Sequence, residues 1–232
     1  MQVENHKEEV PFEHYESAFA KADATEMAAR TGAKWDGKEF YVNLLGTQYA
    51  ISHPVYGIRK CMDGEQIAKG NEVARTMTPH PLPAATPSPQ GEGLGVPVLP
   101  VQTFLLRYLL ESKAVAGNGS WKTFREMPWG ELYIKPYTGR VLTRAAFTFG
   151  TRLAAFKSAC QKMGAAPVDH GDAGFQFDLI GDFKMQILVW EGDEEFPPNA
   201  QVLYSDNFED GFAPEDRVVA GDILISTIKG NM

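Results

Sequence analysis

The stretch that decides the fold runs from Gly174 to Trp190 and reads Gly-Phe-Gln-Phe-Asp-Leu-Ile-Gly-Asp-Phe-Lys-Met-Gln-Ile-Leu-Val-Trp. Apolar and polar residues alternate on both sides of Gly181-Asp182, and alternation with a period of two is typical of strands. A Gly-Asp pair suits the tight turn of a hairpin. We therefore expect a β-hairpin over 174–190, with one face buried and the other partly exposed to solvent.

The rest of the chain mixes helical and strand patterns. Apolar residues at helical spacing, with stop and start signals, predict helices over 11–31, 101–115, 143–163 and 214–229. Short β-type runs predict further strands at 39–45 and 48–51, ending at His53-Pro54, and loop and strand at 121–137. Because the two patterns do not alternate regularly, we expect an α+β fold, with a mixed or antiparallel sheet and about four helices packed on it.

Length and composition predict a single α+β domain over 1–232. The chain has 232 residues, of which 44% are hydrophobic, which is enough to bury a substantial core. One segment differs from its surroundings, because seven of the 15 prolines and three glycines fall between 78 and 100. Proline removes backbone donors and glycine adds chain entropy. We expect a disordered Pro/Gly-rich insert or loop at 78–98.

Charge and cysteine content exclude several classes of protein. The net charge is −8, the pI is about 5.2, and Lys and Arg form no cluster, so neither nucleic acid nor an anionic membrane is an expected partner. No run approaches the roughly 20 apolar residues of a membrane span, and a cytoplasmic location is expected. Cys61 and Cys160 form no CxxC motif, so we expect no iron–sulfur cluster, and the sequence predicts no cofactor.

The acids gather in one segment. Between 191 and 216 there are nine acidic residues and no Lys, Arg or His, while the rest of the chain is nearly neutral. This local excess of negative charge attracts a cation or a basic partner. The candidate binding residues here are Trp190, Glu191, Asp193, Glu194 and Glu195. Glu191 and Asp193 are also candidate ligands of a divalent cation, since hard cations prefer oxygen ligands, although no calcium-loop motif is present. A solvated acidic loop explains the same residues.

Two smaller groups also carry two interpretations. His170 lies between Asp169 and Asp172, which suits a general base but equally suits the turn chemistry of a strand entry. Arg125, beside Trp121 and Phe124, suits a forked anion donor, but also an ion pair that pins a loop to the core. Arg125, Asp172 and His170 therefore join the candidate binding residues.

Four stretches together resemble a domain family of unknown function found in anaerobic bacteria and archaea. They are Trp121–Glu126, Gly171–Phe175, Val189–Pro198 and Pro214–Asp216, and the likeness spans Phe12 to Lys229 without the 78–98 segment. Some longer relatives join this domain to an iron–sulfur segment resembling that of corrinoid methyl-transfer proteins, whose cysteines this chain lacks. The resemblance implies a setting in anaerobic one-carbon or corrinoid metabolism, but no established activity.

The sequence thus favours an accessory or binding protein with an acidic recognition surface at 190–216 and an unknown protein or small ligand as partner. The alternative is a metal-assisted hydrolase or transferase that uses clustered carboxylates from among Glu191, Asp193, Glu195 and Asp172, with His170. The sequence leaves open whether the protein is an enzyme.

Overall fold

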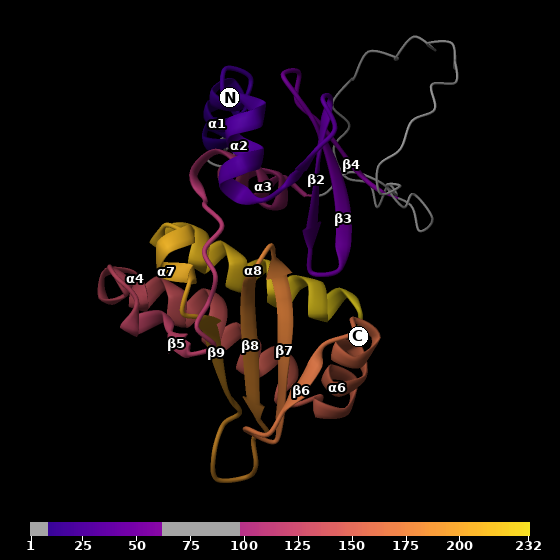
Figure 1. The fold of residues 1–232 in the computed structure, drawn as a ribbon. Helices are drawn as coiled ribbons and strands as arrows, with labels where there is room; N and C mark the ends of the chain where they lie inside the picture. Colours follow the sequence, from indigo (N-terminus) through magenta and orange to yellow (C-terminus); the bar gives the residue numbers. More distant parts are fainter. Residues whose placement is uncertain (1–8, 62–97) are drawn as a thin grey trace, which may run out of the picture.

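The computed structural model describes residues 9–61 and 98–232, which form one nine-stranded sheet with helices packed against it (Figure 1). The main path of the sheet is β4-β3-β2-β7-β8-β9-β5, and β1 and β6 pair at its side. All strand pairs are antiparallel. The α+β class is confirmed.

The strands are β1 (Lys34–Trp35), β2 (Glu39–Leu44), β3 (Thr47–Ser52), β4 (Gly57–Lys60), β5 (Trp121–Thr123), β6 (Ala166–Val168), β7 (Ala173–Ile180), β8 (Phe183–Trp190) and β9 (Asn199–Ser205). The helices are α1 (Glu9–Phe19), α2 (Ala24–Thr31), α3 (Leu99–Glu111), α4 (Gly130–Tyr137), α5 (Arg144–Phe149), α6 (Leu153–Lys162), α7 (Phe208–Gly211) and α8 (Pro214–Gly230), with the 3₁₀-helix η1 (Phe124–Glu126) and the π-helix η2 (Thr138–Thr143). The described helices are more numerous than the four expected.

The β7–β8 hairpin forms as predicted, with Phe177 opposite Met185 across the pair. The face of the hairpin that was expected to be partly exposed is more buried than predicted, because Gln186 and Leu188 of β8 are also buried. The reason is that β8 is an interior strand, paired with β7 on one edge and with β9 on the other. The hairpin of β2 and β3 also forms, and it joins the sheet where the Leu45 N–H donates to the Leu179 carbonyl, at 2.8 Å.

Two predicted helices are each divided in two. The 11–31 helix breaks into α1 and α2, because the Asp23 side chain caps a new start and accepts from the N–H groups of Thr25 and Glu26 at 2.8 and 2.9 Å. The 143–163 helix breaks at Gly150, where an added Cβ would lie 2.4 Å from the Cβ of Pro198. In 121–137 only β5 is a strand, and α4 occupies the end of that stretch.

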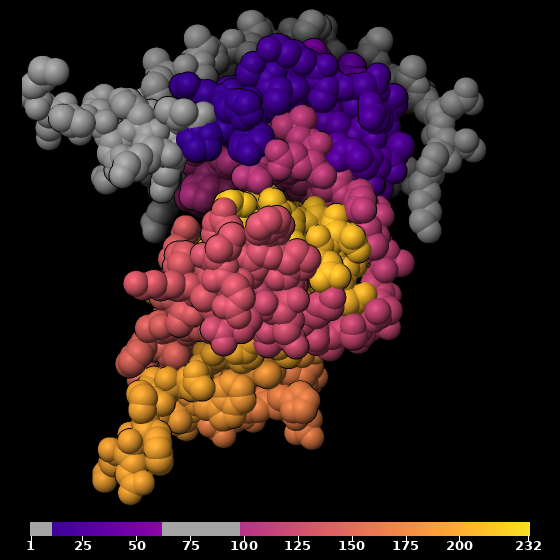
Figure 2. All heavy atoms as spheres, turned by 90° about the vertical axis from the view of Figure 1, so that its left-hand side faces the viewer, coloured from indigo at the N-terminus to yellow at the C-terminus, as the bar shows by residue number. Residues whose placement is uncertain are grey.

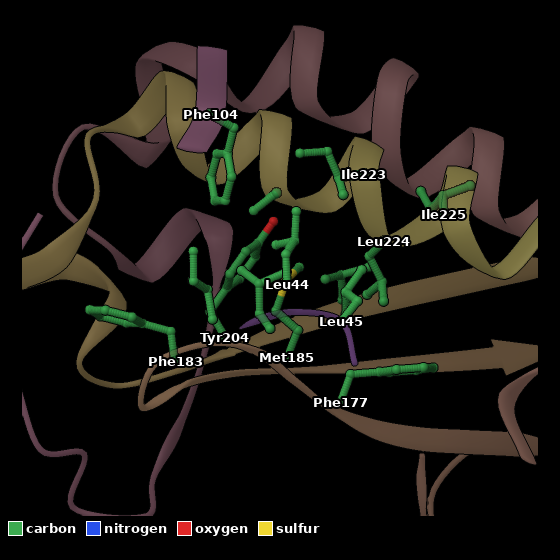
Figure 3. Packing of buried hydrophobic residues seen from close by; sticks show 14 of the residues in the cluster. Leu44, Leu45, Phe104, Phe177, Phe183, Met185, Tyr204, Ile223, Leu224 and Ile225 are labelled. Atoms are coloured by element: carbon green, nitrogen blue, oxygen red, sulfur yellow. The ribbon is translucent and has the colours of Figure 1, made fainter. Parts of the chain in front are cut away.

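The predicted C-terminal helix is the long helix α8, which lies across the sheet (Figure 1). Figure 3 shows Ile223, Leu224 and Ile225 of α8 together with side chains of the sheet, such as Met185 and Tyr204. α8 can lie close to η2 because Gly221 has no side chain. The packing of α8 therefore organises the core and fixes the position of its own first turn.

The predicted Pro/Gly-rich segment 78–98 lies, apart from Val98, outside the described residues. Among the residues that the structure does describe, no helix is long and apolar enough to cross a membrane.

Candidate functional site

A pocket of about 300 Å³ lies where α1, α3 and α8 meet, with η2 at its side. Its apolar lining comes from Pro11, Leu99, Pro100, Phe104 and Val219. Its polar lining comes from Tyr15, Thr103, Arg107, Arg140, Glu215 and Asp216. A largely apolar hollow with a few convergent polar groups is the usual form of a small-molecule site.

Helix periodicity places these groups. On α3, Leu99, Thr103 and Arg107 follow one another at intervals of four, so they share one face, which is apolar at the start of the helix and charged about two turns further on. On α8, Pro214 occupies the first turn and is followed directly by Glu215 and Asp216. The two helices therefore bring a guanidinium and two carboxylates to the same hollow.

The lining of the pocket includes the ion pair of Arg107 and Asp216. Nε of Arg107 lies 2.8 Å from Oδ1 of Asp216, and the Asp216 side chain is only 7% exposed. The Nε–H is buried but is not aligned for a hydrogen bond with that oxygen. Arg107 also contacts Glu111 at 3.2 Å and lies 4.9 Å from the centre of the Tyr15 ring. The guanidinium is thus held by two carboxylates and one aromatic face.

Burial raises the pKa of Asp216 to about 7, although the charge of Arg107 acts in the opposite direction. The negative charges of Glu111 and Glu215 add to the increase in pKa. Desolvation of a carboxylate outweighs a single partner when the partner is itself shared. A carboxyl group of this kind exchanges its proton near neutral pH, and such groups cluster at functional sites.

Glu215 lies at the rim and differs from its neighbour. It accepts a hydrogen bond from the Tyr133 hydroxyl, and that bond is the main reason that its pKa is lowered. Glu215 makes no ion pair with any described residue. The charges of Arg107 and Arg217 lower the pKa of Glu215 further, so the rim carries an ionised carboxylate whose hydrogen-bond partner is neutral.

Arg140 reaches the pocket from η2. Its Nη2 lies 2.9 Å from Oδ2 of Asp222 on α8, and Arg144 pairs with the other oxygen of the same carboxylate. A π-helical turn widens the helix by one residue and frequently marks a functional site. Here η2 and the first residue of α5 direct two guanidinium groups at one carboxylate, which leaves a positive charge in excess.

Sequence reasoning did not identify this pocket. In the sequence, Asp216 stands out only as one of the nine acids and as the end of the stretch Pro214–Asp216. A signal was present, because Ala220 and Ile223 follow Asp216 at intervals of four and seven, which places the carboxylate on the buried face of its helix. No comparable signal linked Tyr15, Arg107 and Arg140, which meet only through tertiary packing.

The structure places the first group of predicted acids in the loop between β8 and β9, which projects from the molecule (Figure 1 and Figure 2). We call residues 191–198 the acidic tip. Glu191, Glu194 and Glu195 are exposed there, and Asp193 turns the loop by accepting from the N–H groups of Glu195 and Phe196 at 2.8 and 2.7 Å. None of the four acids of the tip forms an ion pair with a described residue.

Aromatic side chains flank the acidic tip. Trp190 is 37% exposed and Phe196 is 66% exposed.

Asp172 lies beside the tip, since its Oδ2 accepts from the N–H of Glu191 at 2.8 Å, whereas His170 is exposed and takes no part in that contact. Asp172 and Glu191 are therefore brought together by a structural hydrogen bond.

The other five acids of the 191–216 segment lie beyond the opposite end of β9, so the nine do not form one continuous surface. Each has a structural partner: Asp206 accepts from the N–H of Asn118, and the remaining pairs are Glu209–Lys122, Asp210–Lys113, Glu215–Tyr133 and Asp216–Arg107. The strand β9 separates the two groups because it runs from the acidic tip towards α7 and the start of α8 (Figure 1).

Two further predictions concern metal binding and Arg125. Within 9–61 and 98–232, no group of three or more His, Cys, Asp or Glu side chains is placed to hold a metal ion. Arg125 is exposed and pairs with Glu131 at 3.0 Å, which links η1 to α4. Its neighbour Glu126 instead closes a capping box with Thr123.

Comparison with known proteins identifies the family. Residues 83–227 match the sequence model of a family described as a domain of unknown function (DUF3786). No curated protein and no solved structure matches the chain. The matched residues include α3, η2 and α8 of the pocket, but not α1 or β1–β4, so they support only part of the span over which the resemblance was expected. Since the match covers more than half of the chain, the protein belongs to the DUF3786 family.

Proposed function

We propose that this protein is an accessory protein that binds a small ligand in the pocket between α1, α3 and α8. The observation that carries the proposal is the buried pair of Arg107 and Asp216 in the lining of a mostly apolar hollow. A buried ion pair is weak evidence for stability, because the cost of desolvating two charges commonly exceeds their attraction. Its position in a pocket is better explained by recognition.

The size of the pocket limits the ligand. At about 300 Å³ it is at the lower end of the range for small-molecule sites. The ligand is therefore a small metabolite with an apolar part for Leu99, Phe104 and Val219 and a polar part for the charged end. The setting in anaerobic one-carbon or corrinoid metabolism and a cytoplasmic location belong to the proposal as well, and they rest on the resemblance and composition alone.

A thermal-shift screen tests the proposal. A ligand present at one hundred times its Kd stabilises the folded state by about 2.7 kcal/mol, so small amines, carboxylates and amino acids that bind should raise the Tm. The matched controls are Val219→Phe and Thr103→Phe, which fill the hollow from two different helices. The proposal fails if no compound raises the Tm of the wild type, or if the same compounds stabilise both filled variants equally well.

A second candidate function is docking of a basic partner protein at the acidic tip. Four acids without an ionic partner among the described residues share a loop with Phe196, whose ring is 66% exposed, and Asp193 fixes that loop. A rigid aromatic anchor with charges around it is a common form of protein interface.

Two synthetic peptides test the second candidate. A Lys/Leu amphipathic peptide should shift the amide NMR signals of 191–198, and Phe196→Ala should weaken its binding. A Lys/Ser peptide of equal charge serves as the control. Equal binding of both peptides would show non-specific attraction by charge and would remove the case for docking.

A further inference from the structure

The charges around the pocket are not all balanced within the fold, and the imbalance indicates the class of ligand. Arg107 is already paired with Asp216 and Glu111, so its positive charge is largely balanced within the fold. Asp216, with its pKa raised to about 7 mainly by burial, is only partly ionised near neutral pH. The buried pair therefore contributes little net charge to recognition.

Two groups at the rim lack an ionic partner of their own. Glu215 forms no ion pair with a described residue; the Tyr133 hydroxyl, and after it the charges of Arg107 and Arg217, lower its pKa and keep it ionised. Arg140 shares the single carboxylate of Asp222 with Arg144, so this trio has one positive charge in excess. The pocket thus presents one carboxylate without an ion pair and one guanidinium that shares its carboxylate.

The two groups are placed for a single ligand. Both line the same pocket. Glu215 and Asp222, which holds Arg140, lie two turns apart on α8, about 10 Å along the helix axis at 1.5 Å per residue. A small molecule whose two charges are a few bonds apart bridges this distance, because the long side chains of Glu215 and Arg140 reach towards it from either side. The apolar wall of Leu99, Phe104 and Val219 is left for the uncharged part.

We infer that the ligand of the pocket is a small zwitterion with an apolar side chain, of the amino-acid class, whose ammonium group is bound by Glu215 and whose carboxylate is bound by Arg140. This inference rests on the proposed function, because it names the ligand of the same pocket. A ligand with one charge would satisfy one rim group and leave the other unmatched, which is how a site discriminates between similar molecules.

Three probes with the same isobutyl side chain test the inference: leucine, 3-methylbutylamine and 4-methylpentanoate. Their Kd values are measured by NMR titration of the wild-type protein. Leucine should bind at least tenfold more tightly than either single-charge probe. Equal or tighter binding of the amine or the acid overturns the inference, and so does the absence of binding by leucine.

Two rim variants assign the groups. Glu215→Gln should weaken leucine binding at least tenfold and leave the Kd of 4-methylpentanoate unchanged, whereas Arg140→Gln should weaken leucine binding and leave the amine unchanged. An equal loss for all three probes in either variant would show a structural effect and contradict the assignment. A different outcome is that leucine fails to bind while other compounds bind to the wild type and not to Val219→Phe. That result would support the pocket as a ligand site and would overturn only the inference that its ligand is a zwitterion.

Discussion

Nε of Arg107 and Oδ1 of Asp216 lie 2.8 Å apart in the interior, yet the pKa of Asp216 is raised to about 7. An adjacent arginine normally lowers the pKa of a carboxyl group, so desolvation is the stronger effect here. The guanidinium is shared with Glu111, and Glu215 adds a second negative charge nearby. The pair is therefore a titrating group enclosed by three helices, rather than a simple structural salt bridge.

The first prediction is that stability falls as the pH rises from about 4 to 7. In this window the folded state keeps a proton on Asp216, whose pKa is about 7, while the unfolded chain, with a value of 3.8, has lost it. The free energy of unfolding should therefore decrease by up to about 1.4 kcal/mol per pH unit from this group. Asp216→Asn should lack this contribution. Urea unfolding at several pH values measures both proteins, and parallel pH profiles would contradict the raised pKa.

The second prediction concerns the coupling of the pair. At pH 8, Arg107→Met should destabilise the protein by about 3–5 kcal/mol, because it leaves Asp216 buried and unpaired. The double variant Arg107→Met with Asp216→Leu should recover most of this loss, since two apolar side chains suit the site. A double-mutant cycle by urea unfolding measures the coupling. Strictly additive effects would show that the two charges do not interact.

The third prediction tests the packing that positions α8. In Gly221→Ala, the added methyl group would lie 2.9 and 3.0 Å from the two methyl carbons of Val141, so overpacking should cost about 1–3 kcal/mol. The matched control is Gly139→Ala in η2, where nothing lies within 4 Å of the new methyl group. The control should be neutral or slightly stabilised. Similar Tm values for both variants would mean that α8 and η2 are not closely packed.

The fourth prediction concerns metal binding at the acidic tip. Millimolar Ca²⁺, Mg²⁺ or Mn²⁺ should raise the Tm no more than a monovalent salt of equal ionic strength, because dispersed surface charges are screened over about 8–10 Å. A saturable stabilisation by one metal that disappears in Glu191→Gln with Asp193→Asn would instead support a metal site.

The local parts of the fold were predictable from the sequence. The hairpin of β7 and β8 and the start of α8 at Pro214 follow from periodicity and turn residues within one segment. The break at Gly150 was not predictable, because it depends on the approach of Pro198, a residue far along the chain. The strand β9 is not among the predicted strands, because it lies between two acidic stretches within the predicted acidic surface 190–216.

The same limit applies to the site. The acidic tip is continuous in sequence, and it holds four of the eight binding residues that the sequence predicts. The pocket joins α1, α3, η2 and α8, and its essential feature is the burial of Asp216, which is set by the packing of three helices. Charge counting treats a buried acid and an exposed acid alike, and therefore assigned the same role to Asp216 and Glu194.

The most direct test of the account is an NMR fragment screen of the wild-type protein that maps the amide shifts caused by small amphiphilic compounds. The account predicts that the largest shifts fall on 99–107 and 215–219 and that they are lost in Val219→Phe. Shifts centred on the acidic tip, or spread evenly over the surface, would contradict the claim that this pocket is the functional site.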